Sequence, residues 1–146
     1  MVEILKENTK TRIVFHGAES GMALWINGAF VGYSEDSFTP SAFDISEYIH
    51  EGRNKVAVNV YRFTSGSWLE DQDFWRFSGL FRSVELQSVP FVHVNDLKST
   101  QDVNDLKHPK IIVAPVMEAD EDYTLEYRLF DADHTLLQSK VTNDTC

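Results

Sequence analysis

Acidic and aromatic side chains are concentrated in one short stretch of the chain. Within nine positions it contains Trp68, Glu70, Asp71, Asp73, Phe74, Trp75 and Arg76. Carboxylates accept hydrogen bonds and bind hard cations, while aromatic side chains offer flat apolar faces on which a pyranose ring can stack. The residue types are therefore those of a loop that could bind a sugar or a cation. By composition alone, a solvated acidic loop that is anchored by its aromatic residues is the favoured interpretation.

Other residue types that could do chemistry give little signal. The histidines lack metal-ligand spacing; they are His16, His50, His93, His108 and His134. The single cysteine, Cys146, cannot form an internal disulfide, which fits a reducing compartment. We expect neither a metal cluster of histidines nor a catalytic thiol.

Composition and charge exclude several classes of protein. The chain has 146 residues, of which 42% are hydrophobic and 12% aromatic, so a packed core is expected and global disorder is not. The net charge of −10 argues against nucleic acid or an anionic membrane as a partner. No apolar run approaches the roughly 20 residues that span a bilayer, and the first residues are too charged for a signal peptide. We therefore expect a cytoplasmic protein.

The surrounding sequence alternates between apolar and polar residues with a period of two, which is typical of strands. Asn27-Gly28 stands between two such runs and favours a type I′ hairpin turn, because both residues tolerate positive φ. The predicted strands in this part are residues 12–16, 23–26, 29–33, 55–61 and 80–87. Residues 44–49 could form one helical turn, capped by Asp44, and residues 62–79 show no period.

Pro90 is the predicted domain boundary, dividing the chain into residues 1–89 and 90–146. Beyond it, strands are predicted at residues 91–97, 110–116, 123–130 and 135–141, with a turn at 131–134. In the third of these strands one face is apolar: Tyr123, Leu125, Tyr127 and Leu129. The prediction is an all-β protein made of two pieces of β-sandwich.

Two segments resemble a known family. They are LWINGAFVGYSEDSFTPSAFDI at residues 24–45 and GSWLEDQDFWRFSGLFR at residues 66–82. Together they resemble the N-terminal jelly-roll domain of family 2 glycoside hydrolases, and the second segment is most similar to the β-galactosidases of that family. The resemblance is strong over residues 11–90. After Pro90, only position and strand pattern match the immunoglobulin-like domain that follows in the family.

The resemblance implies a fold and a function. Residues 1–89 would form a partial galactose-binding-like jelly roll, and residues 90–146 a partial immunoglobulin-like β-sandwich. The chain would be a non-catalytic N-terminal fragment of a β-galactosidase, which hydrolyses terminal β-D-galactosides such as lactose. A glycosidase needs two catalytic carboxyl groups, and in this family both are glutamates on a barrel domain that this sequence does not contain. We therefore expect no catalytic residue here and no activity of the chain alone.

The resemblance also assigns roles in the acidic stretch. Asp73 matches an aspartate that reaches the catalytic barrel, contacts the galactose and binds a sodium ion. Trp68 and Trp75 are further expected substrate contacts. Glu70 and Asp71 would instead hold the loop or pair with arginines (Arg76 or Arg82). Any magnesium would belong to the absent barrel, and the protein partners would be the remaining domains or a partner subunit of the enzyme.

Two other functions remain open. The chain could be a free-standing carbohydrate-binding module that uses residues 68–75, or a structural or complementing subunit. We count about five strands before Pro90 and about four after it, where closed sandwiches of these types have about eight and seven. Unpaired strand edges would then be exposed, so we expect a homo-oligomer.

Overall fold

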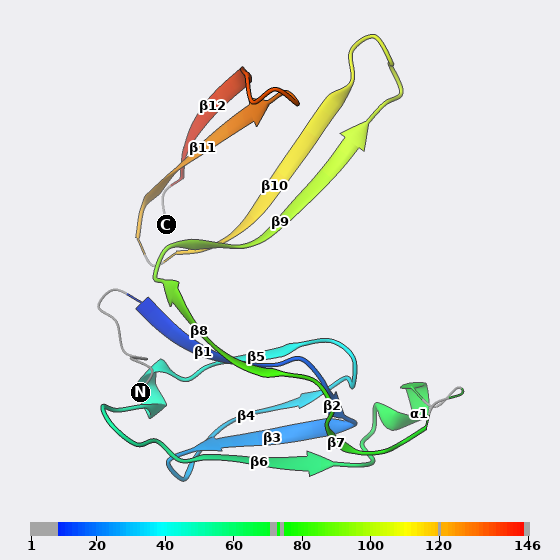
Figure 1. Ribbon diagram of the computed structural model, residues 1–146, viewed down its shortest axis with the longest axis vertical. Coiled ribbons are helices and arrows are strands. Elements are labelled where there is room, and N and C mark those ends of the chain that lie inside the picture. Colours follow the sequence, from blue (N-terminus) through cyan, green and yellow to red (C-terminus); the bar gives the residue numbers. More distant parts are fainter. Residues whose placement is uncertain (1–8, 71–72, 74, 120, 145–146) are drawn as a thin grey trace. The chain divides into compact units, whose positions relative to one another are not determined.

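Two compact units divide the chain, Met1–Val89 (unit 1) and Pro90–Cys146 (unit 2). The computed structural model describes residues 9–70, 73, 75–119 and 121–144 (Figure 1). Strands dominate both units and pair antiparallel wherever a register is described, so the predicted all-β class is confirmed. Among the described residues no helix has the length and apolar character needed to cross a membrane.

Unit 1 contains two three-stranded sheets and one short strand pair. The first sheet has the order β5 (Ser41–Asp44), β1 (Thr9–Phe15), β8 (Val84–Pro90). The second has the order β4 (Ala29–Glu35), β3 (Gly21–Ile26), β6 (Val56–Tyr61). The short pair joins β2 (Ala18–Glu19) to β7 (Gly79–Leu80).

The hydrophobic core of unit 1 comes mainly from the central strands of the two sheets. Alternate residues of each strand contribute to one cluster: Ile13 and Phe15 from β1, and Met22, Leu24 and Ile26 from β3. Ala18 of β2 and Ile45 complete the cluster, and Val58 of β6 packs against it. The cluster takes every second residue of β1 and β3, as expected because side chains of a strand alternate between the two faces of a sheet.

The β3–β4 hairpin has the turn that the sequence predicts. Asn27 and Gly28 have φ values of 53° and 89°, the left-handed conformation of a type I′ turn. The Asn27 side chain also donates to the Tyr48 carbonyl (2.8 Å) and accepts from the Lys55 amide (2.9 Å). The turn residue thus ties the hairpin to the 3-10 turn η1 (Ser46–Tyr48) and to the segment before β6.

Three local predictions in unit 1 need correction. The predicted strand 80–87 is interrupted between β7 and β8, where the Arg82 guanidinium donates to the carbonyls of His16 and Phe38. Residues 67–70, expected to lack regular structure, form the short helix α1 (Ser67–Glu70). The count of about five strands is also too low: the described part of unit 1 has eight, because β2, β5 and β7 were not predicted.

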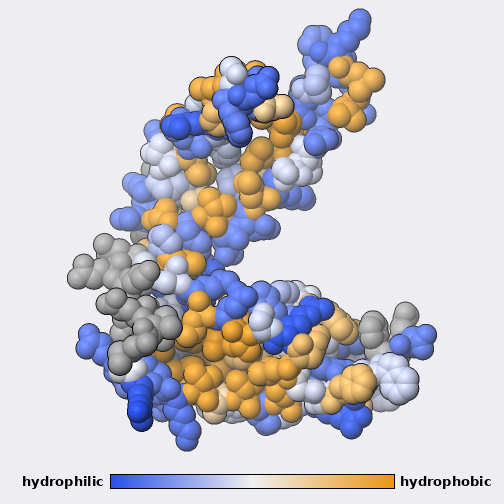
Figure 2. Space-filling model, in the orientation of Figure 1, coloured by the Kyte–Doolittle hydropathy of each residue, from blue (hydrophilic) through white to orange (hydrophobic). Residues whose placement is uncertain are grey.

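Unit 2 consists of two long hairpins. One pairs β9 (His93–Asp102) with β10 (Lys110–Glu118), and the other pairs β11 (Tyr123–Phe130) with β12 (Leu136–Asp144). The Asp131 carboxylate closes the second hairpin by accepting from the amides of Asp133 (2.9 Å) and Thr135 (2.8 Å). Within the described part of unit 2 no side chain is fully buried, and apolar atoms line both hairpins (Figure 2).

Candidate functional site

The acidic and aromatic stretch forms the connection between β6 and β7, residues 62–78, which we call the β6–β7 loop. Its short helix α1 begins where the Thr64 amide donates to the Ser67 hydroxyl at 2.8 Å. The amides of Leu69 and Glu70 then donate to the Gly66 carbonyl at 2.9 and 3.1 Å. A polar start of this kind satisfies backbone groups that a helix end leaves unpaired.

The predicted contact residues of the loop lie at its surface. The exposed fractions of Trp68 and Trp75 are 89% and 83%, and Trp75 stacks on Phe77 with 6.4 Å between ring centroids. Asp73 is exposed, and none of the described residues forms a hydrogen bond or ion pair with it. Asp71, Gln72 and Phe74 lie outside the described residues. Two indole faces and one carboxylate are therefore open to a ligand.

Glu35 of β4 holds the first part of the loop. Its carboxylate accepts from the Gly66 amide (2.7 Å) and from the Ser65 hydroxyl (2.8 Å). The Gly66 hydrogen bond, followed by those from Tyr33 and Ser65, holds the pKa of Glu35 below its ordinary value. Because the folded pKa is lowered, the contribution of Glu35 to stability is present at neutral pH and is lost as the pH falls through that lowered pKa.

Glu70, at the end of α1, holds the middle of the loop. Its two carboxylate oxygens accept from the amide and the hydroxyl of Ser37, both at 2.8 Å. Ser37 is 1% exposed and lies in the connection between β4 and β5. The prediction that Glu70 holds the loop is therefore confirmed, with a serine as its partner; the alternative partner Arg82 donates to backbone carbonyls.

Glu19 of β2 holds the last part of the loop. One of its oxygens accepts from the amides of Phe77 (3.0 Å) and Ser78 (2.9 Å), and the residue is 9% exposed. Close by, Arg76 donates to the buried hydroxyl of Ser20 (2.9 Å) and to the Ser67 carbonyl (2.6 Å). Arg76 thus links the last part of the loop to the first residue of α1 and to Ser20, which lies between β2 and β3.

The residues that anchor the loop were missed by reasoning from the sequence. Glu19, Glu35 and Ser37 lie 30 to 59 positions from the loop residues that they bind. Their types are common on any protein surface, and no local pattern distinguishes them. Only the fold brings them to the loop, so the sequence of the loop itself contained no signal for them.

The described residues alone do not complete a metal site or an enclosed sugar pocket. They contain no group of three or more His, Cys, Asp or Glu side chains that could hold a metal ion. A shallow cavity of about 260 Å³ is lined by β4, β5 and their connection, including Tyr33, Glu35 and Asp36, but not by Trp68, Asp73 or Trp75. A cation or sugar at Asp73 would need further ligands from elsewhere.

Comparison with known proteins gives concordant results. Residues 2–90 match the family model described as glycosyl hydrolases family 2, sugar binding domain. The chain is 51% identical over 126 residues to a β-galactosidase of Clostridium acetobutylicum, which covers 86% of this chain and 14% of that protein. It is 60% identical over 85 residues to a β-galactosidase large subunit of Lactobacillus acidophilus, covering 58% of this chain and 14% of the relative.

Solved structures show the same fold. The structure superposes on a β-glucuronidase of Bacteroides uniformis with a TM-score of 0.78 and 24% sequence identity. The match covers 97% of this chain and 19% of the glucuronidase. At that identity the likeness concerns the fold alone. The chain therefore spans a small part of each of these relatives.

Proposed function

The chain belongs to family 2 of the glycosyl hydrolases, in the region of their sugar-binding domain, and from this premise we propose that it is a non-catalytic part of a β-galactosidase. In this proposal the β6–β7 loop supplies Asp73 as a ligand for a terminal β-D-galactoside and for a sodium ion. Trp68 and Trp75 provide further contacts to the sugar. The rest of the enzyme supplies the catalytic carboxyl groups and the remaining ligands.

One observation supports this assignment above others. Asp73 is exposed and without a described partner, on a loop whose beginning, middle and end are bound to unit 1. An ionised carboxylate accepts hydrogen bonds from hydroxyl groups and binds hard cations. By contrast, Glu70 has both oxygens engaged with Ser37. Asp73 is thus the described acid of the loop that is free to meet a ligand.

The chemistry proposed for the chain is binding and orientation. The Asp73 carboxylate would accept a hydrogen bond from a sugar hydroxyl and place one oxygen on the cation. A bound sodium ion supplies positive charge that polarises and orients the hydroxyl groups beside it. The indoles of Trp68 and Trp75 present apolar faces on which a pyranose ring can stack. No residue of this chain is proposed as a magnesium ligand.

The finer fold assignment belongs to the same proposal. We assign unit 1 to a partial jelly roll and unit 2 to a partial immunoglobulin-like sandwich. The two facing three-stranded sheets of unit 1 support the first assignment. The two hairpins of unit 2, which have no buried side chain in their described part, support the second. The expected location is the cytoplasm, where the one cysteine would stay reduced.

The isolated chain is expected to hydrolyse no galactoside. Cleavage needs an acid/base and a nucleophile or base on either side of the scissile bond, and the proposal places both outside this chain. The measurement is release of the chromophore from an aryl β-galactoside by rigorously purified protein, at millimolar substrate and with added sodium. Turnover above that of a mock preparation would contradict the non-catalytic assignment.

Asp73→Asn is expected to lower kcat/KM about 10- to 100-fold in an active enzyme that contains this loop. The physical reason is loss of one charged hydrogen bond, about 1.5–3 kcal/mol, at the sugar. A suitable enzyme is a chimera in which the matching segment of the Clostridium acetobutylicum β-galactosidase is replaced by that of this chain. Sodium titration of the chimera should also show a weaker dependence on sodium.

Asp71→Asn is the matched control, because it removes the same charge two positions earlier. It should change kcat/KM and sodium dependence by less than twofold. If the Asp73 variant behaves like the parent chimera while the Asp71 variant is impaired, the proposal has chosen the wrong carboxylate.

A free-standing carbohydrate-binding module is the second candidate, because two tryptophans of one loop are so strongly exposed. Titration of the isolated chain with galactose, followed by tryptophan fluorescence, separates the two functions. Saturable binding at millimolar sugar or below by the chain alone would favour the module. If galactose leaves the tryptophan fluorescence unchanged and Asp73→Asn lowers kcat/KM of the chimera, the chain is better described as a non-catalytic part of an enzyme.

A further inference from the structure

We infer that Glu19, Glu35 and Glu70 are positioning residues that fix the β6–β7 loop in place before any ligand binds. The inference rests on the proposed function only in taking Asp73 as the residue that meets the ligand. The order of the loop itself is a property of this chain and can be measured without a sugar. The two claims can therefore fail separately.

The three carboxylates bind the loop at three successive points. Glu35 accepts from Ser65 and Gly66 at its beginning, and Glu19 accepts from Phe77 and Ser78 at its end. Between them, Glu70 reaches from the loop to the buried Ser37. Each carboxylate receives at least two hydrogen bonds at 3.0 Å or less. Hydrogen bonds to an ionised acceptor are shorter and stronger than neutral ones.

The spacing of these contacts limits where Asp73 can lie. Glu70 precedes Asp73 by three residues, and a chain of three residues spans at most about 11 Å. Phe77, whose amide is bound by Glu19, follows Asp73 by four residues. Asp73 therefore lies within four residues of a hydrogen-bonded contact on either side. A ligand that meets a loop ordered in advance spends less of its binding free energy on fixing that loop.

A purely stabilising role is the competing explanation for the same hydrogen bonds. It predicts that removing Glu70 weakens unit 1 as a whole. A positioning role predicts a local effect: the loop loosens while the core of the β-sandwich keeps its protection. Amide hydrogen exchange resolved by residue distinguishes the two, because local and global opening give separate rates.

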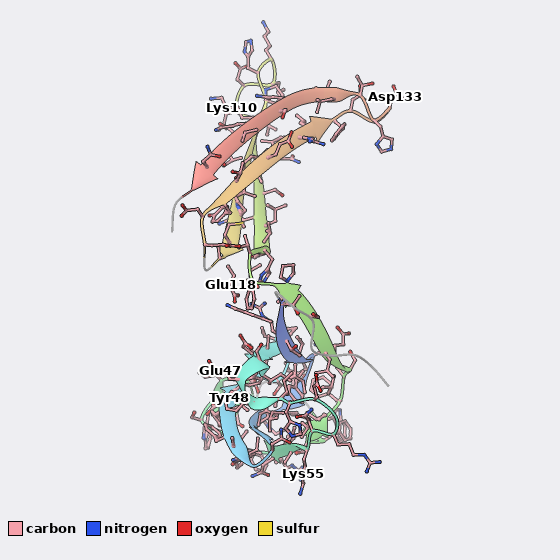
Figure 3. The ribbon with its side chains drawn as sticks, turned by 90° about the vertical axis from the view of Figure 1, so that its left-hand side faces the viewer. Glu47, Tyr48, Lys55, Lys110, Glu118 and Asp133 are labelled. Carbon is pink, nitrogen blue, oxygen red and sulfur yellow. The ribbon has the colours of Figure 1, made fainter. Side chains whose placement is uncertain are left out.

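Glu70→Ala is expected to accelerate hydrogen exchange at least about tenfold at neutral pH, with no ligand present. The amides concerned are those of Ser37, Leu69 and the substituted residue 70. The amides of Met22 and Leu24 in the core should keep their rates within twofold. Glu70→Gln retains one acceptor oxygen and should restore part of the protection. Glu47→Ala is the control, because Glu47 is an exposed acid on η1 (Figure 3). This turn lies at the other end of unit 1 from α1 (Figure 1), so the substitution should leave the loop amides unchanged.

Equal acceleration of loop and core amides would overturn the inference in favour of a general stabilising role. Acceleration of Ser37 alone would also overturn it, because Glu70 would then serve only the β4–β5 connection. The link to function is tested in the chimera by a double-mutant cycle. Glu70→Ala should raise KM at least about threefold when Asp73 is present, and should add less than twofold to Asp73→Asn.

The cycle keeps the two claims apart. If Glu70→Ala accelerates amide exchange only in the loop, and Asp73→Asn leaves kcat/KM unchanged, the positioning role is kept and Asp73 is rejected as the residue that binds the ligand. If Asp73→Asn lowers kcat/KM while Glu70→Ala leaves amide exchange unchanged, Asp73 remains the proposed ligand contact and the glutamates are rejected as positioning residues.

Discussion

Leu24→Ala is expected to lower the free energy of unfolding of unit 1 by about 3 kcal/mol, within the range for truncation of a buried leucine. Leu24 is 0% exposed on β3, the central strand between β4 and β6. Truncation removes three carbon atoms from the contact with Ile13, Phe15 and Met22 and leaves a cavity that the paired strands cannot close. The measurement is urea unfolding followed by far-UV circular dichroism.

Leu69→Ala is the matched control within unit 1, because it makes the same truncation at a residue that is 87% exposed. Its effect should stay within about 0.5 kcal/mol, as for other surface substitutions. Since the substitutions are chemically identical, the difference between them measures burial. Equal urea midpoints for the two variants would mean that the hydrophobic cluster around Leu24 does not stabilise unit 1.

The elements that the sequence predicted well are those fixed by local chemistry. Asn27-Gly28 determines the β3–β4 turn, because a type I′ turn needs positive φ at both central positions and these two residue types tolerate it. The carboxylate of Asp44 accepts from the Ser46 amide at the start of η1, although the residue at the N-cap position is Ile45. The strand predicted at residues 123–130 is β11, because its apolar and polar residues alternate along its whole length.

The elements that were missed are those fixed by distant partners. β2 and β7 are two residues each and exist only through pairing with one another across about 60 positions of sequence. β5 is four residues long and is defined by its register with β1, Phe15 opposite Ser41. A strand of that length has too few residues to show a period. The same limit applies to the site, where the loop composition indicated ligand contacts but two of the anchoring glutamates, Glu19 and Glu35, came from strands β2 and β4.

In unit 2, the alternation of apolar and polar residues along a strand does not determine which surface covers its apolar face. Tyr123, Leu125 and Tyr127 share the predicted apolar face of β11, and all three are only half-buried. Leu129 on the same face is exposed. The alternation predicted which side chains point the same way but not what would cover them. In the described part of unit 2 nothing covers this face completely, so its apolar surface remains available for association.

The chain is expected to associate in solution, as a dimer formed through strand edges and apolar faces. In the described part of unit 2 each sheet has two strands, so every strand has a neighbour on one side only. Such edges present unpaired N–H and C=O groups that pair readily with another chain. Burying roughly 400 Å² of apolar surface at about 25 cal/mol per Å² yields about 10 kcal/mol before the cost of association.

The net charge of the chain opposes this association and makes it depend on salt concentration. Two copies that each have a net charge of −10 repel one another. Salt screens that repulsion, because the Debye length falls from about 10 Å at 0.1 M to about 3 Å at 1 M. The dimer fraction in sedimentation velocity should therefore rise with salt and with protein concentration. Interfaces held mainly by ion pairs would respond in the opposite direction.

Two substitutions on β11 identify the surface that forms the dimer. Leu125→Lys places a charge on the half-buried apolar face, and Thr124→Lys adds the same charge on the opposite face of the same strand. Both reduce the net negative charge equally, so a purely electrostatic effect would strengthen association in both. Loss of the dimer in Leu125→Lys alone would assign the interface to the apolar face. A compact monomer of the unsubstituted chain at every salt and protein concentration would reject association, and the half-covered hairpins of unit 2 would then be stable on their own.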